Sequence, residues 1–158
     1  MRNSLKMKLK IFYFNYLFHC YRRTGVKILH ISDDFKQSEI CLPLNWRTKG
    51  FFGTLFGGSI YSVVDPVLMV MLNMILGKEY VVWDKAATVQ FLKPGRSTLY
   101  ANFRVTDEEI ERIKNDVLKN GKAEIGYQVS LKDSDGVEHA VIGKTLHIRS
   151  RVKKQITQ

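Results

Sequence analysis

Residues 55–76 read LFGGSIYSVVDPVLMVMLNMIL, and Gly77 ends the run. Asp65 is the one charged side chain in this stretch. At about 1.5 Å per residue, a helix of this length could cross a bilayer. The aspartate, a proline and a Gly-Gly pair inside the run, with Lys49 and Lys78 on its two flanks, favour a different interpretation. We expect a helix that is buried on nearly all sides within a globular fold.

Alternating apolar and polar residues on both sides of this run predict β-strands. Six strands are expected, at residues 26–31, 39–44, 80–92, 97–105, 122–132 and 137–149. A second helix is expected from Thr106, which forms a capping box with Glu109, to a stop at Gly121. Alternating strands indicate an antiparallel sheet with one solvated face. The sequence therefore predicts an α+β domain whose sheet wraps around the long central helix, with a second, short helix.

The net charge of +10 is concentrated at the two ends of the chain. Residues 1–30 carry seven Lys and Arg and no acid, whereas residues 31–148 hold fourteen basic and fifteen acidic residues. A neutral middle region argues against nucleic-acid binding, which places basic residues within the domain. We expect a basic amphipathic N-terminal helix at 1–24, one domain at 25–150 and a basic tail at 151–158.

Residues 1–24 place apolar side chains at helical spacing among lysines and arginines. A secretory signal would require a small-residue cleavage site, and Cys20-Tyr21-Arg22 is a poor one. The lack of acidic residues is also typical of a transit peptide. Two further interpretations are a helix that lies on a membrane surface and a helix that packs its aromatic face on the domain or on a partner subunit. The packed helix is the favoured interpretation.

The two cysteines, Cys20 and Cys41, have neither metal-binding nor disulfide spacing. They are typical of reduced thiols in a cytoplasmic protein, which would be peripheral to a membrane if residues 1–24 bind one. We expect no cofactor and no metal ion.

Several blocks of the sequence resemble, in order, the hotdog-fold thioesterase-like superfamily. They are Phe56-Gly57-Gly58-Ser59, Val64-Asp65-Pro66, Val82-Trp83-Asp84-Lys85, Phe91-Leu92-Lys93-Pro94-Gly95 and Asp107-Glu108-Glu109-Ile110. The nearest resemblance is to a poorly characterised thioesterase-like family related to the phenylacetyl-CoA-type thioesterases. In those enzymes a Gly-Gly pair is followed seven residues on by a catalytic Asp. The resemblance covers residues 25–149 and implies the hotdog fold in a homo-oligomer, either a dimer or a dimer of dimers.

The resemblance implies an acyl-CoA or related acyl thioester as substrate and Asp65 as the catalytic base or nucleophile. It makes Phe56, Gly57 and Gly58 the substrate-binding residues, with the glycine amides as oxyanion donors. Seven residues correspond to roughly 10 Å along a helix, which is too far for both groups to act on one carbonyl. In hotdog thioesterases the Gly amides face the acid of the other subunit, so we expect a site at a subunit interface.

Two departures from the pattern leave catalysis open. The histidine usually found before the Gly pair is replaced by Phe56, or by Leu55 one place earlier, and Gly50 lies near the position of the usual asparagine. A non-catalytic protein that binds acyl chains or acyl-CoA is therefore an alternative. Asp65 followed by Pro66 is also typical of a residue that caps a second helical segment after a kink, or that forms a buried structural pair.

Overall fold

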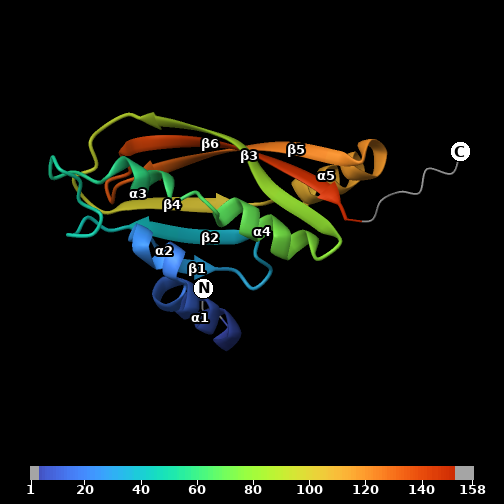
Figure 1. The fold of residues 1–158 in the computed structure, drawn as a ribbon, viewed down its shortest axis with the longest axis horizontal. Coiled ribbons are helices and arrows are strands. Elements are labelled where there is room, and N and C mark those ends of the chain that lie inside the picture. Colours follow the sequence, from blue (N-terminus) through green and yellow to red (C-terminus); the bar gives the residue numbers. More distant parts are fainter. Residues whose placement is uncertain (1–3, 152–158) are drawn as a thin grey trace, which may run out of the picture.

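A computed structural model describes residues 4–151 of the chain (Figure 1). The elements are α1 (Leu5–Phe12), η1 (Tyr13–Leu17), α2 (His19–Thr24), β1 (Lys27–Ile31), β2 (Gln37–Leu42), α3 (Gly57–Tyr61), α4 (Val67–Leu76), β3 (Tyr80–Phe91), β4 (Leu99–Arg104), α5 (Asp107–Asn120), β5 (Lys122–Lys132) and β6 (Glu138–Ser150). The predicted six strands and two later helical regions are all present.

The strands form one sheet in the order β1-β2-β4-β5-β6-β3, and every neighbouring pair is antiparallel. Strand β3 pairs with β6 over its whole length, from Tyr80 opposite Ser150 to Phe91 opposite Ala140. Its other side pairs with no strand within residues 4–151. The predicted α+β class with an antiparallel sheet is confirmed, and the long strand β3 forms one edge of that sheet.

The central helix differs from the prediction because it is interrupted. Helix α3 ends at Tyr61 and α4 begins at Val67, with turns between them. Pro66 has no amide hydrogen to donate to the Ser62 carbonyl, so a continuous helix would lose a hydrogen bond there. Helix α4 still packs one face into the core, through Val67, Leu68, Met71, Leu72 and Leu76. No helix within residues 4–151 is long and apolar enough to cross a membrane.

The N-terminal segment is helical in three pieces and lies against β1 (Figure 1). Met7 and Tyr21 are buried in the core, and Phe14 and Phe18 pack on it. The prediction that this segment packs an aromatic face on the domain is confirmed. The division of the chain into an N-terminal helix, a domain and a tail, at residues 24 and 150, stays a prediction. Of the tail at 151–158, only Arg151 lies within the described residues.

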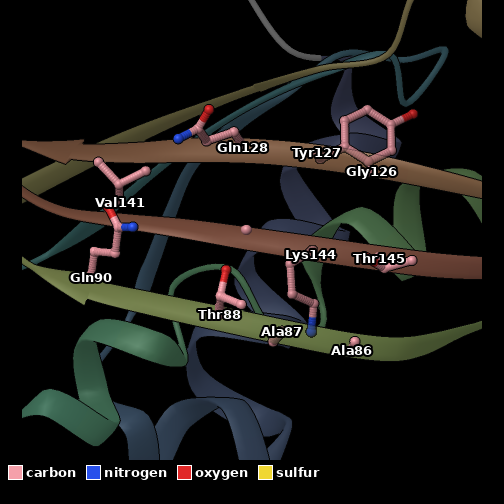
Figure 2. A pocket seen from close by; sticks show the side chains of 11 residues that line it. Ala86, Ala87, Thr88, Gln90, Gly126, Tyr127, Gln128, Val141, Lys144 and Thr145 are labelled. Atoms are coloured by element: carbon pink, nitrogen blue, oxygen red, sulfur yellow. The ribbon is translucent and has the colours of Figure 1, made fainter.

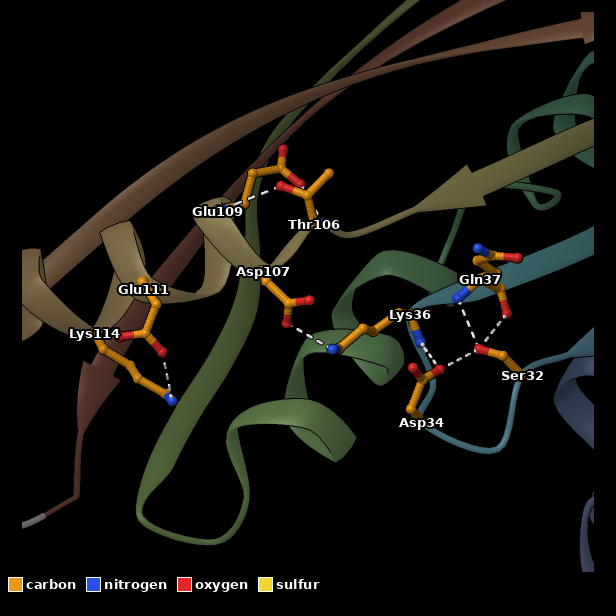
Figure 3. A network of polar contacts seen from close by, with 9 residues as sticks. All are labelled: Ser32, Asp34, Lys36, Gln37, Thr106, Asp107, Glu109, Glu111 and Lys114. Carbon is orange, nitrogen blue, oxygen red and sulfur yellow. Dashed lines mark hydrogen bonds and ion pairs between the residues drawn. The ribbon is translucent and has the colours of Figure 1, made fainter.

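Helix α5 begins as the sequence indicates. The Thr106 hydroxyl accepts a hydrogen bond from the Glu109 amide, and the Glu109 carboxylate accepts one from the Thr106 amide (Figure 3). Lys36, in the turn between β1 and β2, forms an ion pair with Asp107 at 2.6 Å. These contacts hold α5 at the end of the sheet where β2 begins.

Candidate active site

Asp65 lies in the turn between α3 and α4, next to a buried lysine. The Lys144 ammonium donates to Asp65 Oδ1 at 3.1 Å and to the Tyr61 hydroxyl at 3.1 Å, and it lies 2.9 Å from Asp84 Oδ2. The Lys144 side chain is 1% exposed, whereas those of Asp65 and Asp84 are 42% and 23% exposed. The cation is therefore enclosed, and the carboxylate of Asp65 remains accessible to a ligand.

The capping interpretation of Asp65 is wrong. Helix α4 has Pro66 at its N-cap position, and no side chain accepts a hydrogen bond from its first turn. Asp65 Oδ1 instead accepts a hydrogen bond from Lys144, so Asp65 pairs with a buried cation while its own side chain stays 42% exposed. The ion pair and a catalytic role are compatible, because the side chain is not fully covered.

Lys144 was not predicted, although a signal for it exists in the sequence. In β6 the residues Ala140, Ile142, Leu146 and Ile148 are fully buried, and Lys144 occupies the same inward-facing register. A lysine on the apolar face of a strand must find partners, since burying an unpaired charge is costly. Asp84 reaches it from β3, where Ala87 is the residue opposite Lys144.

The cluster shifts the acidity of two of its members. Burial raises the pKa of Asp84 above its usual value, the neighbouring Asp65 carboxyl raises it further, and Lys144 opposes both effects. Burial lowers the pKa of Lys144, but hydrogen bonds to Asp84, Tyr61 and Asp65 outweigh this and the net shift is upward. Asp84 Oδ1 is buried without a hydrogen-bond partner in the described part of the chain. The cluster therefore raises the pKa of both Asp84 and Lys144.

The Gly pair begins α3, as the sequence predicts. Phe56 precedes it with extended backbone and a 60% exposed side chain. The first amides of a helix have no acceptor within the helix, so those of Gly57 and Gly58 can donate to a ligand. A Cβ at Gly57 would lie 3.2 Å from Phe91 Cζ, and one at Gly58 would lie 2.5 Å from Phe56 Cε1. The sequence predicts one long helix beginning at this pair, whose dipole would favour negative charge there. Helix α3 has five residues, so it does not supply the dipole of a long helix.

A surface hollow of about 380 Å³ lies beside the Gly pair. Its lining includes Leu55, Gly57, Ile60 and Phe91 together with the turn at 92–95. One protomer does not bring Asp65 to this hollow, because the contacts of Asp65 run to β6 and those of the glycines run to the Phe56 and Phe91 rings.

A second hollow, of about 400 Å³, lies over β5, β6 and β3 (Figure 2). Small residues form much of its lining, including Ala86, Gly126 and Gly143, with Gln90 and Gln128 beside them. No carboxylate is among the described residues that line it. Within residues 4–151 no group of three or more His, Cys, Asp and Glu side chains is arranged to hold a metal ion.

Solved structures similar to this chain include proteins described as thioesterases. PA5026 from Pseudomonas aeruginosa, described as of unknown function and a probable thioesterase, has a TM-score of 0.81 at 16% identity over 96% of this chain and 100% of its own. The thioesterase HI1161 from Haemophilus influenzae has a TM-score of 0.67 at 14% identity, over 98% and 96%. A mutant of the thioesterase SAV0944 from Staphylococcus aureus has a TM-score of 0.61 at 15% identity, over 83% and 98%.

At these identities the likeness establishes the fold alone, and this is the hotdog fold that the sequence blocks predicted. No curated protein matches the sequence. Residues 17–148 match the family described as "Domain of unknown function (DUF4442)", and this match spans most of the chain. The protein therefore belongs to the DUF4442 family and has the hotdog fold.

Proposed function

We propose that this protein hydrolyses an acyl thioester, with acyl-CoA as the leading substrate class, at a site shared by two subunits. The observation that carries the proposal is the Asp65 carboxylate, fixed by a buried lysine and still 42% exposed. The thioesterases with similar folds support the reaction class.

Hydrolysis requires a polarised carbonyl and an activated nucleophile. The Gly57 and Gly58 amides of one subunit would donate to the thioester oxygen, where negative charge develops. Asp65 of the other subunit would act as a general base on water or attack the carbonyl directly. Lys144 binds one oxygen of Asp65 and so restricts the rotation of the carboxylate. Phe56 and Phe91 would border the acyl group next to the glycines.

The shared site requires a homodimer, and the exposed edge strand β3 supports one. Residues Lys85 to Thr88 of this strand are exposed, and no strand within the described residues covers its outer backbone groups. An uncovered edge of this length invites pairing with a second copy of the same strand.

Complementation tests the proposal. We expect Asp65→Asn to abolish hydrolysis of a panel of acyl-CoA esters and Gly58→Pro, which removes one donor, to reduce it strongly. Unfolding and refolding the two inactive variants together forms hybrid dimers in which one of the two sites is intact. Random pairing would restore about a quarter of wild-type activity. No recovery on mixing would place the site within one subunit, and a wild type without turnover would exclude hydrolysis.

The second candidate function is non-catalytic binding of acyl chains or acyl-CoA, which the replacement of the usual histidine and asparagine favours. It predicts saturable binding of acyl-CoA by calorimetry without release of free thiol. A protein that neither binds nor hydrolyses acyl-CoA would contradict both candidates.

A membrane-surface position accompanies either function. Leu5, Leu9, Phe12 and Tyr16 lie on the side of the N-terminal segment away from the core, and each is at least 50% exposed. Lysines at positions 6, 8 and 10 flank them, which is typical of a helix at an anionic membrane surface. The protein should float with phosphatidylglycerol vesicles, and Leu9→Glu should abolish this while Met74→Glu, at another exposed apolar position, does not. Equal flotation of the two variants would contradict the proposal.

A further inference from the structure

Three arginines and a tryptophan surround a surface hollow that the proposed reaction does not use. The hollow has a volume of about 400 Å³ and is lined by Arg22, Arg23, Trp46 and Arg47. The first two residues end α2, and the other two lie in the loop that follows β2; Figure 1 shows α2 beside that end of β2. All four side chains are exposed, so a ligand can reach them.

The charges of these arginines are not neutralised by any residue in the described part of the chain. None of the residues lining the hollow is acidic, and no ion pair within residues 4–151 involves Arg22, Arg23 or Arg47. A guanidinium presents a planar fork of donors that matches a phosphate oxygen pair. Three such groups around one hollow fit a ligand with more than one phosphate.

Trp46 adds a flat aromatic surface to the same hollow. Its ring is 80% exposed, and the Arg47 guanidinium carbon lies 4.8 Å from the ring centroid. An exposed indole is a stacking surface for a nucleobase, and a guanidinium beside it strengthens such a site. A phosphorylated adenine nucleotide combines the two chemistries that the hollow offers.

The two halves of the hollow are held together by a close contact. Gly25 follows α2 at φ +83°, and a Cβ there would lie 2.2 Å from Thr48 Cγ2. Thr48 is fully buried, and its hydroxyl donates to the Pro43 carbonyl and accepts from the Asn45 amide. The end of α2 and the loop at 45–48 are therefore packed directly against each other, which keeps the backbones that carry the arginines adjacent.

The hollow lies close to the Gly pair of the same protomer. The Phe56 amide donates to the Thr48 carbonyl at 2.8 Å, next to an isolated antiparallel bridge between Lys49 and Leu55, so Thr48 and Phe56 lie opposite each other. Arg47 and Gly57 are each one residue further along. Two Cα steps and one strand spacing put their Cα atoms at most about 13 Å apart.

We propose that the hollow formed by Arg22, Arg23, Trp46 and Arg47 binds the nucleotide end of a coenzyme A thioester. The phosphates lie on the guanidinium groups, the adenine stacks on Trp46, and the pantetheine arm runs toward Gly57 and Gly58. The inference rests on the proposed function for the position of the thioester. It also favours coenzyme A thioesters over thioesters of a carrier protein, because the hollow would bind the nucleotide. Anionic lipid headgroups offer the same phosphate chemistry and are the competing source.

Calorimetry on the full chain tests the proposal with free coenzyme A, ADP and pantetheine as separate probes. We expect coenzyme A and ADP to bind and pantetheine to bind much more weakly. Arg47→Gln, and the double variant Arg22→Gln with Arg23→Gln, should each weaken coenzyme A binding about tenfold or more. Arg104→Gln on β4 makes the same charge change outside the hollow and should bind as the wild type does. Matching thermal melting curves establish that the variants are folded.

Three results would overturn the proposal. They are the absence of coenzyme A binding, equal binding by the hollow variants and Arg104→Gln, and binding of the hollow to phosphatidylglycerol vesicles but not to coenzyme A. Hydrolysis of an acyl-pantetheine thioester, which lacks the nucleotide, separates this inference from the reaction. If the protein hydrolyses thioesters and the arginine variants bind coenzyme A as the wild type does, the nucleotide site is wrong and the proposed hydrolysis stands. If coenzyme A binding depends on the arginines but no thioester is hydrolysed, the proposed hydrolysis is wrong and the nucleotide site stands.

Discussion

At the scale of single residues, Lys144 explains how Asp65 and Asp84 can lie together under the sheet. One cation shared by two carboxylates leaves the group with a net negative charge when all are ionised, and burial already raises the pKa of Asp84. Removing the cation leaves two partly buried carboxyl groups next to each other without a counter-charge. The cluster is therefore the part of the candidate site whose stability depends most on pH.

Lys144→Met should destabilise the protein by about 2 kcal/mol at pH 8, below the range for fully buried pairs because both carboxylates are partly exposed. The pKa of Asp84 is raised in the folded state, so its protonated form stabilises the fold below the unfolded pKa. That stability is lost as the pH rises through the folded value. The deficit of Lys144→Met should therefore shrink at pH 4, as measured by urea unfolding at both pH values.

Lys85→Met is the matched control, because Lys85 of β3 forms an exposed ion pair with Glu124 of β5 at 2.6 Å. It should change stability little at either pH, since exposed pairs contribute little. A Lys144→Met deficit that does not vary with pH would show that lost packing, and not charge, is the cause.

The sequence identified Asp65 as unusual because it is a lone charge in an apolar run, and the Gly pair was located correctly. Alternation along β6 puts Lys144 among inward-facing residues, so a buried cation could be predicted as well. Its partners could not be predicted. The meeting of Lys144 with Asp65 and Asp84 depends on β3 pairing with β6 and on the turn after α3 reaching the same point.

At the scale of elements, the strands follow the predicted alternation closely, and β5 has the predicted bounds of 122 and 132. The break between α3 and α4 was harder to predict from the sequence, and so was the division of the N-terminal helix into three parts. Periodicity gives the buried face of a helix, but a turn in the middle of it depends on local backbone bonds and packing.

Asn15 shows how an N-terminal element is attached to the sheet. It lies in η1, is buried, and its side-chain amide exchanges two hydrogen bonds with the backbone of Ile28, at 2.9 Å to the carbonyl and 2.8 Å from the amide. The side chain thus covers backbone groups on the edge strand β1, which would otherwise be open to pairing.

Asn15→Ala should cost about 2 kcal/mol, because it leaves the buried amide and carbonyl of Ile28 without partners. Hydrogen exchange should show faster exchange of the Ile28 amide and of η1, with α5 unchanged. The control is Asn120→Ala at the exposed end of α5, which should leave Ile28 protected. Wild-type protection of Ile28 in Asn15→Ala would show that aromatic packing alone holds the segment.

At the scale of the whole molecule, the antiparallel sheet around a central helix was predictable, because patterning over six strands and several sequence blocks agree. No single pattern in the sequence predicts that the chain pairs with a second copy of itself. This pairing is inferred from an edge strand of twelve residues whose outer side pairs with no strand in the described chain, and from a candidate site that one protomer does not complete.

The pairing of two β3 strands leads to a direct prediction about oligomeric state. Thr88→Lys together with Gln90→Lys adds two charges to the exposed part of β3 and repeats them on its symmetry mate. Lysines on an edge strand oppose pairing with another strand, so sedimentation should show the mass falling from a dimer to a monomer. Acyl-CoA hydrolysis should fall with it, since the shared site is lost.

Leu29→Lys on the opposite edge strand β1 is the matched control and should remain dimeric and active. A dimer that survives the β3 lysines but not Leu29→Lys would place the subunit interface on β1, and a monomeric wild type would exclude a site shared by two subunits.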